Sequence, residues 1–433
     1  EIPFELPEGW EWCRFTSVTV NRDSERKPIS SANRTNVAKI YDYYGASGKI
    51  DKIDKFIFNE KLLLIGEDGA NLVTRSKPIA FFAEGQYWVN NHAHCIDSTD
   101  KLILEYLCLY INAISLEKYV TGSAQPKMTQ DNMNSILIAL PPYEEQKRLE
   151  FQVNHILKTV STIENEKEDI VNYIISAKSK ILDLAIRGKL VPQDSNDEPA
   201  SVLLERIRAE KEELIKAGKI KRDKKESIIF KGDDNSYYEK VGVEIRCIDS
   251  EIPFEIPDGW MYERLGNICS IARGGSPRPI ENYLTDDENG LNWIKIGDTE
   301  QGGKYIYSTK EKIRPEGLSK TRYVCSGDFL LTNSMSFGRP YILRTNGCIH
   351  DGWLVIGGIE IAFHQDYLYY MLSSSIMYNA LSSLAVGSTV KNLKSDSVKS
   401  LLVPIPPLAE QACISRQIEN YFATMLPIER SLS

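Results

Sequence analysis

The most constraining pattern in the sequence is an apolar repeat that runs from about Glu144 to Gly188. A seven-residue apolar repeat is typical of a helix that buries one stripe against another helix. At a rise of about 1.5 Å per residue, this helix would be roughly 65 Å long. A single long amphipathic core helix is the alternative interpretation. The positions alternate steps of four and three residues, with Lys167 as the one polar member: Leu149, Val153, Ile156, Val160, Ile163, Ile170, Ile174, Ala177, Ile181 and Leu184.

The same rhythm returns late in the chain, after a second Pro-Pro pair. Pro141-Pro142 and Pro406-Pro407 each precede one apolar repeat, and a Pro-Pro pair ends one element and lets the next begin. Two copies of one stripe are natural partners, so we predict a helix pair. Its seam is predicted to join Leu149, Val153, Ile156, Val160 and Ile163 to Ile414, Ile418, Tyr421 and Met425, with Ile428 continuing the second series.

The second helix is expected to be short. Only five residues follow Ile428, and Pro427 lies in the expected last turn. The stripe from Ile170 to Leu184 would then lack a partner within the chain. An uncovered apolar stripe is an association site, which predicts self-association of two copies through this seam.

A repeated frame also organises the rest of the chain. Glu1–Trp10 returns as Glu251–Trp260, while the residues between these phrases and the helices share little sequence. The phrases are 250 positions apart and the apolar repeats 265, so the second unit is about 15 residues longer. We predict an α+β protein with two mixed α/β domains joined by an antiparallel pair of long coiled-coil helices. The predicted parts are a first mixed α/β domain at 1–142, a central helical region at 143–250, a second mixed α/β domain at 251–407 and a shortened helix at 408–433.

Local patterns place several elements within this frame. Short β-type runs alternate with Gly, Asn and Ser clusters, and amphipathic runs mark helices. The segment from Gly232 to Lys240 is polar and is predicted to be mobile. Predicted strands are Tyr41–Gly45, Phe56–Phe58, Leu62–Gly66, Ala80–Phe82 and Tyr87–Val89, and predicted shorter helices are Leu102–Ala113, Ser201–Ala217 and Gln365–Ser374.

Enzyme and metal motifs are missing from the sequence. It contains no GxxxxGK[ST], GxGxxG, HExxH or GxSxG pattern, and its eight cysteines are scattered. His92 and His94 are predicted to share one face of a strand, but they lack partners at zinc-binding spacing. We therefore predict no metal and no cofactor on this chain. Unpaired cysteines and the lack of a long apolar run favour a reducing, cytoplasmic setting.

Charge is unevenly distributed along the chain. The net charge of -8 opposes binding to nucleic acid, yet binding depends on where charges cluster. The segment from Gly302 to Asn346 contains eight Lys or Arg residues against three acidic residues. That surplus is typical of a DNA-facing surface, with a solvated face as the alternative. The basic run Lys219–Lys225 has the same two interpretations.

Side chains that match base edges gather in Gly-punctuated loops, where the backbone can approach phosphate. In the first unit the candidate DNA-binding residues are Ser47, Lys49, Lys52, Asn71, Arg75, Asn90, Asn91 and His92. In the second unit they are Arg273, Ser276, Arg278, Asn333, Ser334, Ser336, Arg339 and His350. A loop that closes each unit adds phosphate-contact candidates, with a plain connecting turn as the alternative: Ser123, Gln125, Lys127, Lys391 and Asn392.

Several phrases together resemble one known family. They are Leu184–Gln193 with Asp197–Ser201, the twin Pro-Pro-x-x-Glu-Gln helix starts, the twin Ile-Pro-Phe-Glu-x-Pro-x-Gly-Trp phrases, Tyr44–Gly48 and His350–Trp353. Across essentially its whole length, the chain resembles the specificity subunits of type I restriction-modification systems.

That resemblance implies a function and a set of partners. Such a subunit is not catalytic; it reads a bipartite, asymmetric site in double-stranded DNA with one recognition domain per half-site. Its paired helices set the spacer and dock two methylation subunits, which bind S-adenosylmethionine. Restriction subunits that use ATP and Mg²⁺ complete the assembly. The alternatives are a coiled-coil protein-binding scaffold that does not read DNA, and a DNA-modifying enzyme with its own catalytic centre.

Overall fold

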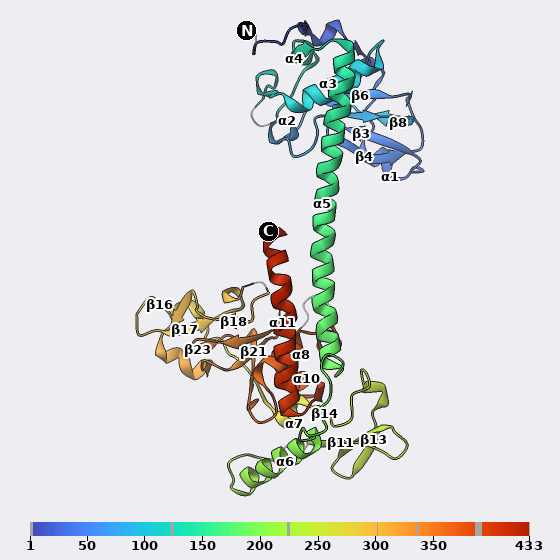
Figure 1. Cartoon of the computed structure of the whole chain (residues 1–433). Helices are drawn as coiled ribbons and strands as arrows, with labels where there is room; N and C mark the ends of the chain where they lie inside the picture. Colours follow the sequence, from blue (N-terminus) through green and yellow to red (C-terminus); the bar gives the residue numbers. More distant parts are fainter. Residues whose placement is uncertain are drawn as a thin grey trace. The chain divides into compact units, whose positions relative to one another are not determined.

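The computed structural model describes residues 3–122, 125–222, 226–300, 302–334, 337–385 and 392–432 (Figure 1). The chain divides into two compact units, Glu1–Glu166 and Lys167–Ser433. The boundary falls inside helix α5 (Tyr143–Ile186) and not at its start. Within the described ranges, no helix is long and apolar enough to cross a membrane, and no group of three or more His, Cys, Asp or Glu residues is arranged to hold a metal.

Unit 1 is built on two four-stranded sheets, in the orders β2-β9-β6-β7 and β4-β3-β8-β5. Neighbouring strands are antiparallel except for the parallel pair β3 and β8. Strand β6 is buried at all five positions, which explains its unbroken apolar sequence. The strands are β1 (Glu11–Arg14), β2 (Val20–Asn21), β3 (Tyr41–Gly45), β4 (Gly48–Ile53), β5 (Phe58–Asn59), β6 (Leu62–Gly66), β7 (Ala80–Ala83), β8 (Gln86–Val89), β9 (Ala93–Asp97) and β10 (Leu137–Leu140).

Helix α3 (Lys101–Ala113) covers the sheet that contains β6. The side chain of Asp100 caps its N-terminus by accepting a hydrogen bond from the amide of Leu102. Its apolar face, which includes Leu104 and Leu107, packs in the core with residues of β6. This helix and strands β3, β6, β7 and β8 confirm the sequence prediction within one residue at each end. Only β5 begins two residues later than predicted.

Unit 2 repeats this topology with different side chains. Its two sheets have the orders β15-β24-β21-β22-β18 and β16-β19-β17-β23-β20, and β17 is parallel to β23 as β3 is to β8. The paired strands β14 and β25 correspond to β1 and β10. The strands are β14 (Met261–Arg264), β15 (Ser270–Arg273), β16 (Leu284–Thr285), β17 (Leu291–Ile294), β18 (Tyr305–Ile306), β19 (Glu311–Ile313), β20 (Arg322–Val324), β21 (Phe329–Thr332), β22 (Pro340–Leu343), β23 (Gly347–Ile349), β24 (Trp353–Gly357) and β25 (Leu402–Ile405).

The extra residues of unit 2 lie mostly in one connection. Strands β3 and β4 are joined by a tight turn at 46–47, whereas their counterparts β17 and β19 are joined by residues 295–310. The longer connection includes β18, which adds a fifth strand to the sheet beside β22. Helix α8 (Gln365–Ser373) lies beside β22 and agrees with the predicted helix, and α9 (Ser375–Leu384) follows it.

A small subdomain precedes the sheets of unit 2. Helix α6 (Ala200–Lys216) was predicted, but the prediction of a mobile segment at Gly232–Lys240 is wrong because β11 (Ser227–Lys231), β12 (Tyr237–Val241) and β13 (Glu244–Cys247) form an antiparallel sheet there. Glu239 on β12 is buried and accepts hydrogen bonds from the guanidinium of Arg264 on β14. This contact anchors the polar segment to the core, and local composition does not reveal it.

Each long helix begins directly after its Pro-Pro pair, as predicted. Helix α5 begins at Tyr143 and α11 (Leu408–Leu432) at Leu408. The two starts are capped alike: the Gln146 side chain donates to the carbonyl of Pro141, and the Gln411 side chain donates to that of Pro406. Pro427 lies inside α11 and does not end it.

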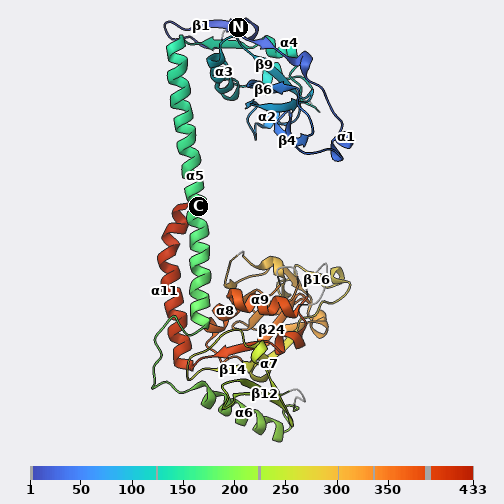
Figure 2. The same ribbon diagram turned by 90° about the vertical axis from the view of Figure 1, so that its right-hand side faces the viewer.

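Helix α11 runs antiparallel along the C-terminal half of α5 (Figures 1 and 2). At the start of α11, Glu410 accepts a hydrogen bond from Gln193, which follows α5. Near its end, Glu429 Oε1 lies 2.6 Å from Nζ of Lys178. Sequence number rises along one helix as it falls along the other, so the predicted antiparallel pair is present.

The predicted seam of this pair is wrong. Ile414 and Ile418 are fully buried in a core to which Ile181 also packs, whereas Ile156 and Ile163 are about 60% exposed. The α5 stripe that the sequence leaves without a partner is therefore the one that α11 covers. An antiparallel helix brings its first turns to the last turns of its partner, so repeat-equivalent positions do not meet. This result removes the basis for predicted self-association through 170–184.

Candidate nucleic-acid interface

In unit 2, several predicted DNA-binding residues converge on Asp351, in the loop between β23 and β24. Nε of Arg273 and Nδ2 of Asn333 donate to the backbone carbonyl of Asp351, at 2.9 and 2.8 Å. Oγ of Ser276 donates to one carboxylate oxygen at 2.8 Å, and Arg278 donates to the other at 3.3 Å. These five residues, which we call the Asp351 cluster, come from three separate loops.

The carboxylate of Asp351 is ionised at neutral pH. Burial alone would raise its pKa, but the hydrogen bond from Ser276 and the nearby positive charge of Arg273 lower the pKa below its usual value. The side chain of Arg278 is 78% exposed, so most of its donors remain free for a ligand. The cluster thus holds a guanidinium in a defined place at the surface, as recognition of phosphate or a base edge requires.

His350 acts differently from its predicted role. Its Nε2 accepts a hydrogen bond from the amide of Ile296 at 3.1 Å, and its Nδ1 lies 2.8 Å from the amide nitrogen of Gly352. Burial lowers the pKa of His350, so the ring is neutral at pH 7. A neutral ring accepts at one nitrogen only, and Nδ1 also lies 3.6 Å from Oδ1 of Asp351, an acceptor for its proton. The ring therefore fixes the start of the long β17–β19 connection against the Asp351 loop.

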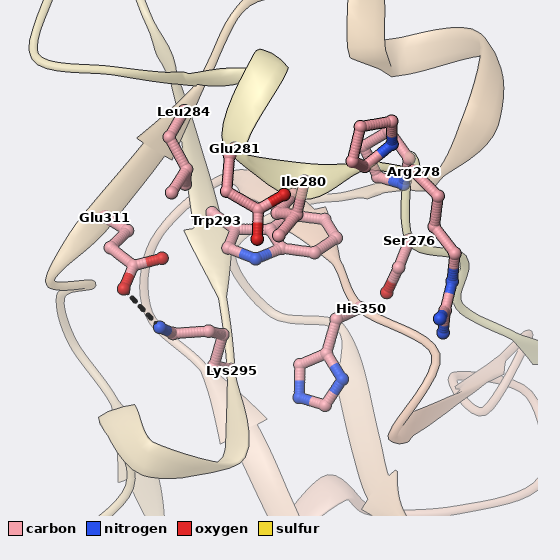
Figure 3. Close-up of a pocket in the computed structure, with 11 residues that line it drawn as sticks. Ser276, Arg278, Ile280, Glu281, Leu284, Trp293, Lys295, Glu311 and His350 are labelled. Atoms are coloured by element: carbon pink, nitrogen blue, oxygen red, sulfur yellow. Dashed lines mark hydrogen bonds and ion pairs between the residues drawn. The ribbon is translucent and has the colours of Figure 1, made fainter.

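A pocket of about 730 Å³ lies next to the Asp351 cluster (Figure 3). Its side chains come from the segment after β15, from β17, from β19 and from the loop after β23. Lys295 and Glu311 form an ion pair on one side of it. The lining residues are Ser276, Pro277, Arg278, Pro279, Ile280, Glu281, Leu284, Trp293, Lys295, Glu311 and His350.

The remaining candidates of unit 2 are less concentrated. Arg339 is exposed, and Ser334 and Asn392 are half-buried, while Ser336 and Lys391 lie outside the described residues. The basic segment 302–346 does not form one surface. For example, Lys304 is mostly buried among tyrosine rings and pairs with Asp366 at 2.6 Å.

Unit 1 places its closing loop in the same way as unit 2. The amide of Glu67, just after β6, donates to the carbonyl of His92, as the amide of Asn333, just after β21, donates to Gly352. The carbonyls of Glu67 and Asn333 accept from Met128 and Leu393, respectively. Each unit therefore attaches the loop before its last strand, β10 or β25, to the C-terminal end of an equivalent sheet strand, β6 in unit 1 and β21 in unit 2.

Several predicted residues of unit 1 are exposed near this end of β6 or on the β3–β4 hairpin. His92 is exposed with Nδ1 2.7 Å from Asp68, and Lys127 pairs with Glu67. Lys49 and Lys52 on β4 both face the carboxylate of Asp42. Among the other candidates, Asn91 and Gln125 are exposed, Ser47 is half-buried, and Ser123 lies outside the described residues.

Three residues of unit 1 that were predicted to contact DNA form hydrogen bonds within the protein instead. Arg75 donates to the carbonyls of Ile111, Asn112 and Ile114, and so caps the C-terminus of α3. The other two bind their own loops: Asn71 accepts from the amide of Lys77, and buried Asn90 accepts from the amide of His92.

The prediction that His92 and His94 share a face is wrong, because β9 begins between them at Ala93. His94 is 1% exposed, with Nδ1 2.6 Å from Asp23 and Nε2 2.9 Å from the carbonyl oxygen of Met128. Both ring nitrogens face oxygen acceptors. The ring ties the closing loop of unit 1 to Asp23, a residue that the sequence did not single out because nothing local marks it.

A buried charge network surrounds His94. Arg26 pairs with Asp23 and with Glu67, and Lys127 also pairs with Glu67. Burial would raise the pKa of both carboxyls. For Asp23 the hydrogen bonds with His94 and the amide of Cys95 and the charge of Arg26 together outweigh burial, and for Glu67 the hydrogen bonds from Lys127 and Arg26 do, so each pKa lies below its usual value.

We expect this network to make unit 1 sensitive to acid. A carboxyl with a lowered folded-state pKa stabilises the fold fully above its ordinary pKa of about 4, and this stabilisation is lost as pH falls through the folded-state value. Asp23→Asn should remove about 2 kcal/mol of the free energy of unfolding at pH 7 and less at pH 3, because the loss begins as pH falls below the ordinary pKa of about 4. Urea unfolding with pulsed hydrogen exchange of unit 1 peptides measures this difference.

The matched control is Asp68→Asn, whose partner His92 is exposed. An exposed pair contributes less than about 1 kcal/mol, so this variant should resemble the parent chain at both pH values. Equal losses for Asp23→Asn at pH 7 and pH 3 would show that the buried charge is not the cause.

Comparison with known proteins agrees with the repeated architecture. Residues 7–181 and 257–432 match the family described as type I restriction modification DNA specificity domain. The specificity subunit of the Escherichia coli type I restriction enzyme EcoEI is 27% identical over 98% of this chain and 79% of its own length. The EcoAI specificity subunit of Escherichia coli is 28% identical over 63% of this chain and 53% of its own length.

Solved structures show the same fold. The HsdS subunit from Thermoanaerobacter tengcongensis aligns with a TM-score of 0.51 and 16% identity. The alignment covers 100% of this chain and 93% of the HsdS chain. A chain from a study of complex assembly and conformational transition of the type I R-M system aligns over 99% of this chain and 94% of its own length, with a TM-score of 0.54 and 16% identity. With a family match in each unit, the chain belongs to the type I restriction-modification DNA specificity family, as a specificity subunit of such a system.

Proposed function

We propose that this chain reads a bipartite, asymmetric site in double-stranded DNA, with one half-site per unit, and that it catalyses no reaction itself. The observation that carries the proposal is one fold built twice with different side chains at equivalent positions. His92 and Gly352 occupy the same backbone position, yet one carries an exposed imidazole and the other no side chain. Different donors and acceptors select different bases, so the two half-sites should differ.

We further propose that the chain acts within a larger complex. Two methylation subunits would dock on the long helices and carry S-adenosylmethionine, while restriction subunits would use ATP and Mg²⁺. The names of the relatives, which are subunits of type I restriction enzymes, support membership in such a complex. The exposed apolar positions of α5, including Ile156, Val160 and Ile163, are of the kind that proteins cover with a partner.

Methylation mapping tests whether the chain recognises a bipartite DNA site. The chain is expressed with its methylation subunit, and host DNA is examined by long-read sequencing for modified bases. We expect one non-palindromic motif with two different halves and a fixed gap. A palindromic motif would contradict asymmetric reading by two different units. Absence of methylation by an assembled complex would favour the protein-binding scaffold.

Salt dependence provides an independent prediction for the isolated chain. Each phosphate contact releases counterions, so the logarithm of the binding constant should fall linearly with the logarithm of salt concentration, by roughly 0.9 per contact. For about four to eight contacts, we expect a slope of about -4 to -7 in fluorescence anisotropy with a duplex that contains the mapped motif. A slope near zero would contradict DNA reading.

A further inference from the structure

The pocket beside the Asp351 cluster has a wall suited to a flat ring. The accessible part of this wall is formed by Ile280 and Leu284, which are half-buried and pack against the cluster of Trp293, itself only 2% exposed. Aromatic and aliphatic side chains of this kind hold the faces of unstacked nucleobases. At about 730 Å³, the pocket has ample room for one nucleotide.

Two polar groups at this wall make no hydrogen bond or ion pair with any described residue of the chain. One is the indole N–H of Trp293, whose side chain is 2% exposed, and the other is the carboxylate of Glu281, which is exposed. Figure 3 shows both side chains among those that line the pocket. An N–H group that lines a pocket and has no partner in the protein can donate to an acceptor on a ligand. Together the two groups offer one donor and one acceptor to the edge of a bound ring.

The other polar groups restrict the kind of ring. A second carboxylate, that of Glu311, lies in the pocket and is paired with Lys295. Carboxylates accept hydrogen bonds only, so they favour an edge that presents an amino group. Adenine, cytosine and guanine present one, and thymine does not.

The rim of the pocket connects it to the DNA-facing cluster. Ser276 and Arg278 belong both to the pocket lining and to the Asp351 cluster. An exposed guanidinium at the rim is placed to hold the phosphate of a nucleotide whose base has entered the pocket.

We propose that this pocket captures one amino-bearing nucleobase swung out of the DNA duplex, so that unit 2 reads one position of its half-site extrahelically. The inference rests on the proposed function and goes beyond it, because reading bases in the groove needs no such pocket. Swinging a base out costs the free energy of stacking and pairing, and favourable contacts in the pocket must offset this cost.

A duplex in which the captured base is already unpaired tests this proposal, because the protein no longer has to break that pair. Duplexes with the mapped motif are made with an abasic site opposite each base of the unit 2 half-site in turn, and 2-aminopurine replaces each adenine in a second set. At one position we expect about tenfold tighter binding to the abasic duplex, because the pairing cost is already removed. If that position is adenine, 2-aminopurine fluorescence should rise several-fold on binding.

Glu281→Gln should reduce the tenfold gain to about threefold or less, because a neutral carboxamide is a weaker acceptor for the amino group. Glu316→Gln, an exposed glutamate outside the pocket, is the matched control and should keep the full gain. Binding of free dAMP, dCMP or dGMP that depends on Glu281, without a gain on any abasic duplex, would assign the pocket to a free nucleotide and overturn base capture.

The remaining outcomes separate the inference from the function on which it rests. Specific binding of full strength with no gain at any position would overturn base capture and leave DNA reading intact. Failure to bind the mapped duplex in preference to an unrelated one would overturn both.

Discussion

Ile414→Ala should destabilise unit 2 by about 2–5 kcal/mol, the largest effect that we expect from a single truncation in the helix pair. Ile414 is fully buried at the start of α11, in a core shared with the last turns of α5. Removing three carbons leaves a cavity that the packed helices cannot close, in addition to the lost transfer free energy. Urea unfolding with pulsed hydrogen exchange of α11 peptides assigns the loss to this unit.

Ile156→Ala is the matched control, because the sequence places both isoleucines in the same predicted seam. Ile156 is 60% exposed, so its truncation in the isolated chain should change the free energy of unfolding by less than about 0.5 kcal/mol. Equal costs for the two variants would contradict the pairing described here. Such a result would mean that α11 covers the N-terminal half of α5, which contains Ile156.

Asp351→Ala should lower the preference for the mapped motif over unrelated DNA by about 10- to 100-fold. The carboxylate holds Ser276 and Arg278, and charged hydrogen bonds of this kind contribute about 1.5–3 kcal/mol. Loss of the negative charge should at the same time strengthen binding to unrelated DNA a few-fold, since phosphate is no longer repelled. Competition binding at fixed salt concentration measures both changes.

Asp286→Asn removes an exposed acidic charge of unit 2 that is not part of the cluster. This control separates the general effect of charge from the positioning effect, since it should change both affinities alike and keep their ratio. If Asp351→Ala also kept the ratio, then Asp351 would act only through its charge and the cluster would have no role in specificity.

Local patterns were sufficient for much of the fold. Apolar periodicity and the Pro-Pro pairs predicted where α5 and α11 begin, because helix formation depends on residues within a few turns. Strands β3 and β6 were predicted with correct ends, since β-type runs are bounded by turn residues. The repeated phrases also predicted two units of one architecture.

The candidate interface was predicted only in part. The loops that carry Arg273, Ser276 and Asn333 were singled out by composition, and the structure brings these residues together. Asp351 lay in a recognised phrase but was not chosen, because the sequence does not show that four side chains converge on it. Arg75 was chosen as a DNA contact, yet it caps α3, a partner 36 or more residues away in the chain.

The sequence by itself therefore determined the helices, several strands of unit 1, the repetition of the two units and the family, because these depend on near neighbours and on composition. The tertiary structure alone decided which half of α5 meets α11, which polar side chains remain free, and where the buried side chains of Asp23 and His94 meet. Those outcomes depend on distances between residues far apart in the chain. Packing fixes such distances, and no local pattern encodes them.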